Sequence, residues 1–378
     1  IISAGFGKAA SGPIMNSRII DYTAVDRADQ PDVLPRLVED FARAYPDQRI
    51  LVIGCGDNYV RQISLASDGF PANVIRHYME FSLLDRLANK QSFYELCDQG
   101  GITHPATFIY DESTGGRLDL GFEPPYIVKP ANSVTWWENP FVGQRKVHLE
   151  KDLAGLKTLL STIYAHGYPD SMIIQEYIPG NDSQVYTVTQ YYDSAGVMRL
   201  NCVGRVLLEE HTAHGFGNSA VTLSVDLPEL DGQLSGLLLA NAYRGYACFD
   251  IKFDERDQQF KVFEVNTRQP RSNYYVTGSN MNITKFIVED LVYGRQLEPE
   301  LQVSDPYLWH VTSKQVARQC ASQAGLLAAV DALIDNGRSG NPLDYAADRH
   351  PARRLWLARY TYQQGRKYQE YRQDVLNA

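Results

Sequence analysis

Two carboxylates and a carboxamide in one short stretch of the chain could hold a divalent cation. Asp250 lies in the apolar segment 248–254, and Glu264 and Asn266 end the segment 261–266. Alternate residues of a strand face the same side, so Glu264 and Asn266 project together, and Asp250 joins them if the strands pair across 254–259. Such oxygen ligands suit Mg²⁺ when substrate phosphates complete its coordination. The alternative is a solvated acidic sheet face, but an unpaired charge among these apolar neighbours would be costly.

Two further segments could bind a nucleotide. Lys129 closes the apolar run 126–130 and needs an anion, which is either a nucleotide phosphate or a structural carboxylate. The run 172–178 leads into a Pro-Gly turn and then into Asp182. The backbone groups of such a strand edge can bind adenine, with Asp182 on the ribose hydroxyls. Each segment alone is weak evidence, and their order and spacing together carry the prediction.

Short apolar runs and helical patterns must position these side chains. The run 49–54 is rich in β-branched residues and predicts a buried parallel strand, preceded by a helix over 33–45. Asp57 is placed to cap a helix that begins near Asn58. The intervening Gly-Cys-Gly turn could cradle a phosphate, but a tight strand-to-helix turn is the favoured interpretation. The segment 82–99 predicts one helix, which Gly100 and Gly101 end.

The middle of the chain predicts mainly strands. They are expected at 126–130, 172–178, 184–192, 198–208, 247–253 and 260–266, with a hairpin turn at 115–116 and a helix over 230–243. After Pro299 helical patterns dominate, so a domain edge is expected there. The fold class is therefore α/β combined with α+β.

Length and composition describe an ordinary globular chain with more than one subdomain. It has 378 residues, of which 44% are hydrophobic, and a net charge of -9, which makes nucleic acid a poor partner. Its five cysteines are scattered and form no CxxC pair, which indicates reduced thiols and a cytoplasmic location. No apolar run is long enough to span a bilayer. The sequence starts at Ile1, and we expect native residues to precede it.

The ordered motifs resemble the signature of the ATP-grasp ligases between Lys90 and Gly294. The resemblance implies an N-terminal Rossmann-like α/β domain over 1–89, an ATP-grasp domain over 90–298 whose two α+β subdomains clasp ATP, and a helical extension over 299–378. It implies that Lys90 and Lys129 contact the nucleotide phosphates. It also implies that the 175–178 strand binds adenine and that the two carboxylates and Asn266 hold Mg²⁺, with two ions expected. The residues assigned to the nucleotide are Lys90, Lys129, Ser133, Gln175, Glu176, Ile178 and Asp182.

Several motifs look more narrowly like the D-aspartate ligases of peptidoglycan assembly, over nearly the whole chain. They are the segments 55–57, 92–97, 129–133, 178–183 and 266–272. That family activates the β-carboxylate of D-aspartate and couples it to the side-chain amine of a peptidoglycan stem peptide. The resemblance therefore implies a ligase with an amino-acid donor and a peptidoglycan-precursor amine as acceptor.

Arginines that follow the predicted metal motif suit the chemistry of an acyl phosphate. Guanidinium groups grip carboxylates and phosphates in bidentate fashion. Arg268 is assigned to the reacting phosphate and Arg271, with Ser272 and Asn218, to the substrate; the two arginines could exchange roles. Surface salt bridges are the alternative for both.

A basic turn could close over the phosphates during the reaction. The segment 143–146 carries Arg145 and Lys146 beside a glycine, and both are assigned to catalysis. An ordinary exposed turn is an equally good interpretation. The cluster Glu209, Glu210, His211 and His214 lacks zinc spacing and is expected to line the substrate site.

Three rival functions and the role of the C-terminal tail stay open. An ATP-grasp ligase for another acid or acceptor would share every nucleotide residue, and a silent nucleotide-binding regulator is less favoured because the motifs are intact. A protein kinase is disfavoured, because the sequence contains no kinase catalytic-loop motif. The basic, aromatic tail 349–372 predicts a helix packed on the body, with peripheral membrane or nucleotide-linked precursor contact as the second choice. A homodimer is conceivable.

Overall fold

A computed structural model describes residues 2–9, 12–112, 117–212, 215–321 and 324–375 of the chain. The N-terminal part contains two parallel strand pairs. They are β1 (Ala4–Gly7) with β2 (Asp21–Ala24), and β3 (Ile50–Val52) with β4 (Val74–Arg76). Helices α1 (Val33–Ala44) and α2 (Asp57–Leu65) accompany them. The parallel strand predicted at 49–54 is thus confirmed over Ile50–Val52, but it is half-buried rather than buried.

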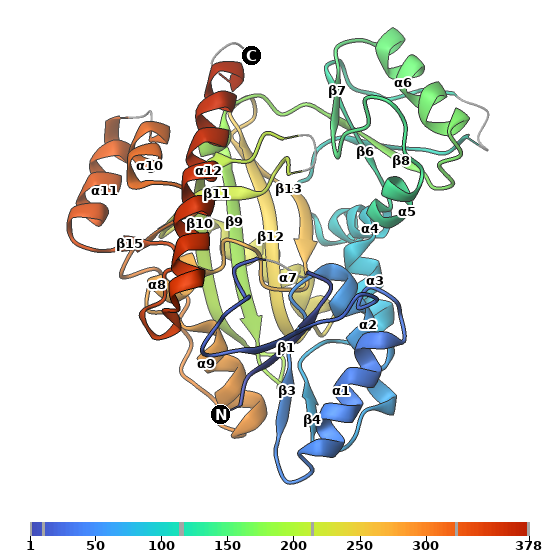
Figure 1. Ribbon diagram of the computed structural model, residues 1–378. Coiled ribbons are helices and arrows are strands. Elements are labelled where there is room, and N and C mark those ends of the chain that lie inside the picture. The colour runs from blue at the N-terminus through green and yellow to red at the C-terminus, as the bar shows by residue number, and fades with distance from the viewer. Residues whose placement is uncertain (1, 10–11, 113–116, 213–214, 322–323, 376–378) are drawn as a thin grey trace.

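Two further sheets make up most of the rest (Figure 1). Within the described residues the larger has seven strands, in the order β13-β12-β9-β10-β11-β14-β15. The smaller has four, in the order β5-β8-β6-β7. The larger contains β9 (Val185–Tyr192), β10 (Met198–Glu209), β11 (Ser219–Val225), β12 (Gly245–Asp254), β13 (Gln259–Asn266), β14 (Leu308–His310) and β15 (Ser339–Gly340). The smaller contains β5 (Thr107–Tyr110), β6 (Tyr126–Pro130), β7 (His148–Glu150) and β8 (Met172–Glu176).

Helices cover the large sheet and one face of the small sheet. They are α3 (Phe81–Ala88), α4 (Lys90–Gly100), α5 (Ser133–Glu138), α6 (Leu153–Ala165), α7 (Asp231–Ala240), α8 (Tyr274–Gly278), α9 (Ile283–Ile287), α10 (Lys314–Cys320), α11 (Ala324–Asp335) and α12 (Pro351–Val375). Short 3-10 turns span Ser67–Gly69, Asp182–Gln184, Pro228–Leu230 and Ala346–Asp348, and a π-helical turn spans Val288–Val292. Apolar side chains of α4 and α7 form one core with the large sheet, and those of α8, α9 and α12 form another. None of the helices in this described part combines the length and the apolar character that a bilayer span requires.

The structure corrects the helix predicted over 82–99. The chain forms two helices, α3 and α4, because Asn89 interrupts them and caps the second one. Its side-chain oxygen accepts hydrogen bonds from the backbone N–H of Gln91 (3.0 Å) and Ser92 (3.2 Å). Lys90 therefore stands at the first turn of a helix. The predicted end is confirmed, since Gly101 adopts a left-handed φ of 64°.

The structure also changes three other local predictions. Asp57 is the first residue of α2 rather than its cap, and Gly56 holds the capping position. The predicted helix 230–243 is shorter, because α7 covers Asp231–Ala240. The C-terminal part is mainly helical, but its strands β14 and β15 extend the large sheet beside β11. The hairpin turn predicted at 115–116 lies outside the described residues.

Candidate active site

The paired strands β12 and β13 bring the predicted metal ligands together. Asp250 lies opposite Glu264, and Cys248 lies opposite Asn266, in an antiparallel register with an irregularity after Asp250. The Asn266 side-chain amide donates to Asp250 Oδ2 over 3.0 Å. The expectation that the two strands pair and that Asp250 joins the other two side chains is therefore confirmed.

Three lysines, Lys90, Lys129 and Lys146, offset the negative charge of Glu264. Lys90 Nζ lies 3.3 Å from Glu264 Oε2. This lysine, followed by the more distant Lys129 and Lys146, lowers the pKa of Glu264, although burial opposes the effect. Burial, and then the nearby Glu264 carboxylate, raise the pKa of Asp250. The two carboxyl groups thus favour a single negative charge until a further cation joins them.

The donor set of this cluster fits magnesium better than a softer metal. It offers carboxylate oxygens of Asp250 and Glu264 and the carboxamide oxygen of Asn266, all hard ligands. No group of three His, Cys, Asp or Glu side chains with metal-binding geometry occurs in the part of the chain that the structure describes. Two carboxylates and an amide leave positions for phosphate oxygens and water, as Mg²⁺ requires.

Lys129 is half-buried beside this cluster, near the end of β6. Its Nζ lies 3.4 Å from the Tyr94 hydroxyl and 5.7 Å from the centre of the Phe263 ring. The Tyr94 hydroxyl in turn donates to the backbone carbonyl of Phe263, next to Glu264 (2.7 Å). Burial, followed by repulsion from Lys90, lowers the pKa of Lys129 to about 7. A half-buried ammonium in this position is suited to a phosphate anion, which would favour its charged form.

We call the three predicted ligands Asp250, Glu264 and Asn266 the metal-ligand cluster. Arg268 links this cluster to the N-terminal part of the chain. It grips the Asp57 carboxylate through Nε (2.7 Å) and a terminal nitrogen (3.1 Å), and it reaches Asn266 Oδ1 over 3.3 Å. Asp57 is far more exposed than Arg268, with 71% against 22% of the side-chain surface accessible. Asp57 was predicted only to cap a helix, and its contact with Arg268 spans 211 positions that no local pattern reports.

The end of β8, predicted to bind adenine, is braced by an ionic network that ties the two sheets together. The Glu176 carboxylate accepts from Lys261 (2.9 Å) on β13 and from Arg256 (2.8 Å) in the β12–β13 turn. Both cations also contact Asp254, at 2.8 Å and 2.6 Å, whose side chain is 0% exposed. The backbone N–H of Glu176 is used as well, because it donates to Ala106 (2.9 Å). Glu176 is therefore held in place on both sides.

Replacing Asp254 by asparagine should destabilise the protein by about 3 kcal/mol, because Lys261 and Arg256 lose a buried counter-charge. Arg256 and then Lys261 hold the pKa of Asp254 far below its usual value. The stabilisation is thus fully present above the unfolded pKa of about 4 and is lost as the pH falls below it. Urea unfolding at pH 7 and at pH 3 tests this, and Asp257→Asn, whose carboxylate is 41% exposed, serves as the control with an effect under about 1 kcal/mol. An Asp254→Asn loss that does not shrink at pH 3 would contradict the electrostatic explanation.

Lys252 and Asp182 continue this edge toward the ends of β9 and β10. Lys252 Nζ donates to the backbone carbonyls of Ile178 (2.9 Å) and Gly180 (3.1 Å). Asp182 Oδ2 accepts from the backbone N–H of Glu209 (2.8 Å) and lies 3.0 Å from His211 Nε2. Gln175 is buried and donates to the Thr107 hydroxyl (2.7 Å). His214, from the same predicted cluster, lies outside the described residues.

Glu209 is a site residue whose role the sequence left vague. Burial and the adjacent Asp182 carboxylate raise its pKa, while His211 and Lys252 act in the opposite direction. Its charge also raises the pKa of Asp250, one of the predicted metal ligands. The sequence had placed Glu209 only in a cluster with Glu210, His211 and His214 that was expected to line the substrate site.

The basic turn 143–146 crosses from the small sheet toward the large one. Lys146 donates to the backbone carbonyl of Phe216 (3.0 Å), and its charge lowers the pKa of both Glu264 and Asp250. Arg145 is different, because its side chain is exposed and its charge acts on His148. Its backbone anchors the turn, since its carbonyl accepts from Trp136 (3.1 Å) and its N–H donates to His148 Nε2 (3.2 Å). The charge of Lys146, and not that of Arg145, thus acts on these two carboxylates.

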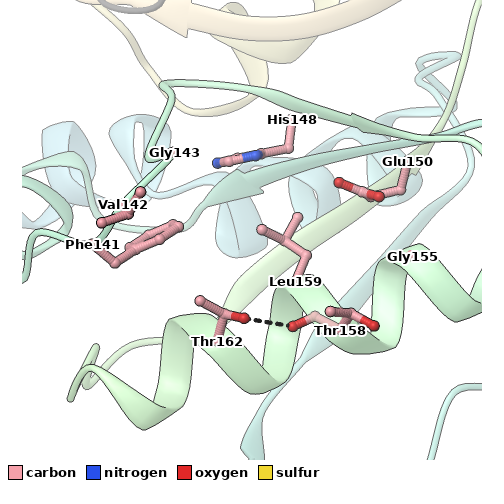
Figure 2. Close-up of a pocket in the computed structure, with 9 residues that line it drawn as sticks. All are labelled: Phe141, Val142, Gly143, His148, Glu150, Gly155, Thr158, Leu159 and Thr162. Atoms are coloured by element: carbon pink, nitrogen blue, oxygen red, sulfur yellow. Dashed lines mark hydrogen bonds between the residues drawn. The ribbon is translucent and has the colours of Figure 1, made fainter.

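A cavity of about 380 Å³ lies on the outer flank of this turn, between β7 and α6 (Figure 2). Its walls are Phe141, Val142, Gly143, His148, Glu150, Gly155, Thr158, Leu159 and Thr162. None of the residues assigned to nucleotide, metal or substrate lines it. The cavity is therefore separate from the cluster of charged residues described above.

The residues assigned to the substrate, Arg271, Ser272 and Asn218, lie beside the cluster of charged residues, on the side of α12. Arg271 NH1 lies 3.4 Å from Glu210 Oε2, and its NH2 donates to the Tyr360 hydroxyl (3.1 Å). Ser272 is buried just before α8. Asn218 is exposed, and its backbone carbonyl accepts from the backbone N–H of Glu210 (2.8 Å). Ser133 begins α5, but its side chain lies outside the described part.

Comparisons with known proteins identify the family and the fold of the chain. No protein-family model matches the sequence. Over 356 residues the chain is 32% identical to the D-aspartate ligase of Enterococcus faecium (strain Aus0004), which covers 91% of this chain and 84% of that protein. An L-amino acid ligase from Bacillus licheniformis has a similar fold at 14% identity, with a TM-score of 0.55 over 78% of this chain and 68% of its own. The biotin carboxylase domain of the Hydrogenobacter thermophilus 2-oxoglutarate carboxylase, solved with MgADP, ADP and bicarbonate, has a TM-score of 0.61 at 11% identity over 82% and 68% of the two chains. The fold is the ATP-grasp fold that the sequence resemblance implied.

Proposed function

The chain belongs to the D-aspartate ligase family and is an ATP-dependent carboxylate–amine ligase, and we propose that its donor is the β-carboxylate of D-aspartate. In this proposal ATP converts the carboxylate to an acyl phosphate, and the side-chain amine of a peptidoglycan stem-peptide precursor then displaces phosphate. The supporting observation is the convergence of Asp250, Glu264 and Asn266 with Lys90, Lys129 and Arg268.

The proposed roles follow from charge. The transferred phosphoryl group carries spread negative charge, so positioned cations supply most of the catalysis. Lys90 and Lys129 hold the phosphates, Arg268 stabilises the reacting phosphoryl group, and Lys146 covers it and excludes water. Asp250, Glu264 and Asn266 would hold two Mg²⁺ ions, which when bound neutralise the phosphate charge. Adenine lies along the 176–178 backbone, with the ribose at Asp182.

The remaining parts of the proposal concern the whole chain. We divide it into an N-terminal α/β unit (1–89), an ATP-grasp unit (90–298) and a C-terminal extension (299–378), whose strands share the large sheet. The free state of the five cysteines supports a cytoplasmic location. Assembly as a homodimer belongs to the same proposal, with at most peripheral membrane contact through α12 and no role for nucleic acid.

A hydroxamate screen tests the proposed reaction. The protein is incubated with ATP, Mg²⁺ and hydroxylamine and with D-Asp, L-Asp, D-Glu or D-Asn in turn. Hydroxylamine traps an acyl phosphate, so hydroxamate with D-Asp above the other acids is the expected result. Hydroxamate with another acid would replace the donor and keep the chemistry. ATP turnover without hydroxamate for every acid would contradict acyl-phosphate formation.

Replacing Arg271 by alanine should raise the KM for the donor acid by roughly tenfold to a hundredfold, because a charge-assisted hydrogen bond contributes about 1.5–3 kcal/mol. The KM for ATP should change by less than about twofold. Initial rates in the hydroxamate assay, with each substrate varied in turn, give both constants. A larger effect on ATP would move Arg271 to the nucleotide and would exchange its role with that of Arg268.

A further inference from the structure

Helix α12 is fixed to the body of the protein at its start, so its far end has a defined place. Arg353 is buried and donates to the backbone carbonyls of Pro13 (3.0 Å) and Leu343 (2.7 Å). It also forms an ion pair with Asp348 (3.2 Å), which accepts from Ser17 (2.9 Å). Figure 1 shows α12, in red, crossing in front of β9 and β10 and ending beside the upper ends of these strands.

Near that end, α12 meets the residues that follow β10 and β13. Lys367 forms an ion pair with Glu210 Oε1, and Tyr360 accepts the hydrogen bond from Arg271. Glu210 also accepts from Thr212 (2.6 Å) and lies 3.4 Å from Arg271. We call Glu210, Arg271, Tyr360, Lys367 and Tyr368 the α12 cluster. Glu210 is its buried centre, with 10% of its side chain exposed.

The α12 cluster has one positive charge more than its own contacts neutralise. Arg271 and Lys367 are cations, and the Glu210 carboxylate supplies one negative charge, because the two cations lower its pKa although burial opposes them. Tyr368 is 3% exposed, and its buried hydroxyl lies beside the Arg271 guanidinium but makes no hydrogen bond of ordinary geometry with the described residues. Buried polar groups in folded proteins are nearly always paired. An anion that brings one negative charge and accepts a hydrogen bond would complete the cluster.

The α12 cluster is close to the proposed reacting centre along the chain. Arg271 follows Arg268 by three residues, which span at most about 10 Å even when fully extended. Arg268 itself contacts Asn266 in the metal-ligand cluster. A donor with two carboxylates is therefore the kind of small molecule that would bridge the reacting centre and the α12 cluster.

We propose that α12 completes a carboxylate subsite, in which Lys367 and the Tyr368 hydroxyl join Arg271 in binding the non-reacting carboxylate of the donor amino acid. Tyr360 and Glu210 are positioning residues that hold the guanidinium of Arg271 and the ammonium of Lys367. The inference rests on the proposed function, because it assumes that the donor is an amino acid with two carboxylates. It makes the C-terminal extension part of the substrate site.

Kinetics of α12 variants in the hydroxamate assay test the subsite. Lys367→Met should raise the KM for D-aspartate about tenfold, since it removes one charge-assisted contact, while the KM for ATP stays within about twofold. Lys367→Arg should restore most of the loss, and Tyr368→Phe should raise the same KM several-fold. Arg359→Ala, on the exposed side of the same helix, is the matched control and should match the wild type.

Two further readouts distinguish a donor subsite from a structural role of α12 and from a site for the acceptor. A purely structural role would lower the melting temperature of Lys367→Met and shift both KM values and kcat together, which would overturn the proposal, as would an unchanged KM for the acid. A carboxylate could also come from the acceptor, so the KM for a lysine-containing peptide with a free carboxyl terminus is compared with that for its amide. A Lys367→Met effect confined to the free-acid peptide would keep a carboxylate subsite but overturn its assignment to the donor.

Direct binding keeps the test decisive if the proposed reaction fails. Titration calorimetry measures D-aspartate binding to the wild type and to Lys367→Met in the presence of MgADP. Binding by the wild type that weakens about tenfold in the variant would support the subsite even without hydroxamate formation. Equal binding by both proteins, or none by the wild type, would overturn it. The failure of the subsite is thus distinguishable from the failure of the ligase reaction.

Discussion

We expect Glu264→Gln to reduce the rate of hydroxamate formation by about a thousandfold or more. This reduction corresponds to roughly 4 kcal/mol of lost transition-state stabilisation. The substitution preserves the shape of the side chain but removes one of two carboxylates in the cluster. Lys90, 3.3 Å away, then loses its partner, and the repulsion that raises the pKa of Asp250 is relieved. The remaining Asp250 and Asn266 form too weak a site for a divalent cation.

The measurement needs a control for charge and for folding. Glu255→Gln, in the exposed turn between β12 and β13, changes the same residue type in the same hairpin and should keep the wild-type rate. A melting temperature near that of the wild type would show that Glu264→Gln remains folded. Raising the Mg²⁺ concentration should recover part of the rate, because the variant binds the ion less tightly. Wild-type turnover at low Mg²⁺ would remove Glu264 from the proposed metal site.

Lys129→Met should weaken ATP binding by roughly tenfold to a hundredfold, because the loss of a charged hydrogen-bond donor costs about 1.5–3 kcal/mol. The apolar methionine fills the same buried space beside Tyr94 and Phe263, so the fold should be retained. Titration calorimetry with MgATP and no acid measures the affinity. Lys151→Met, at an exposed lysine between β7 and α6, is the control. Equal ATP affinities for Lys129→Met and this control would exclude a contact between Lys129 and the phosphates.

The pH dependence of nucleotide binding adds an independent check on Lys129. Its pKa in the free protein is lowered to about 7 by burial and by Lys90. A bound phosphate raises that pKa, so nucleotide binding takes up a proton when the pH is above about 7. Affinity should therefore be greatest below pH 7 and fall as the pH rises. Lys129→Met should lack this component, and an unchanged pH profile in the variant would contradict the assignment.

The sequence alone determined the parts of the protein that depend on local patterns. Strands β6, β9, β10, β12 and β13 lie where short apolar and alternating runs predicted them, because side-chain periodicity reports burial directly. The metal-ligand cluster was predictable for the same reason. Asp250, Glu264 and Asn266 lie on two strands joined by a short turn, so their approach follows from strand geometry. The ATP-grasp fold and the ligase family were implied by the resemblance of these ordered motifs to known ligases.

Tertiary structure decided the contacts between segments far apart in the chain. The Asp57–Arg268 and Lys367–Glu210 pairs span 211 and 157 positions, and neither has a periodic signal in the sequence. The break at Asn89 was also missed, because a capping side chain competes with a helical pattern that otherwise continues. Local periodicity fixes which face of an element is buried, but not which distant element covers it. The packing of whole helices and sheets therefore chose the partners of Arg268 and Arg271, and with them the proposed place of α12 in the substrate site.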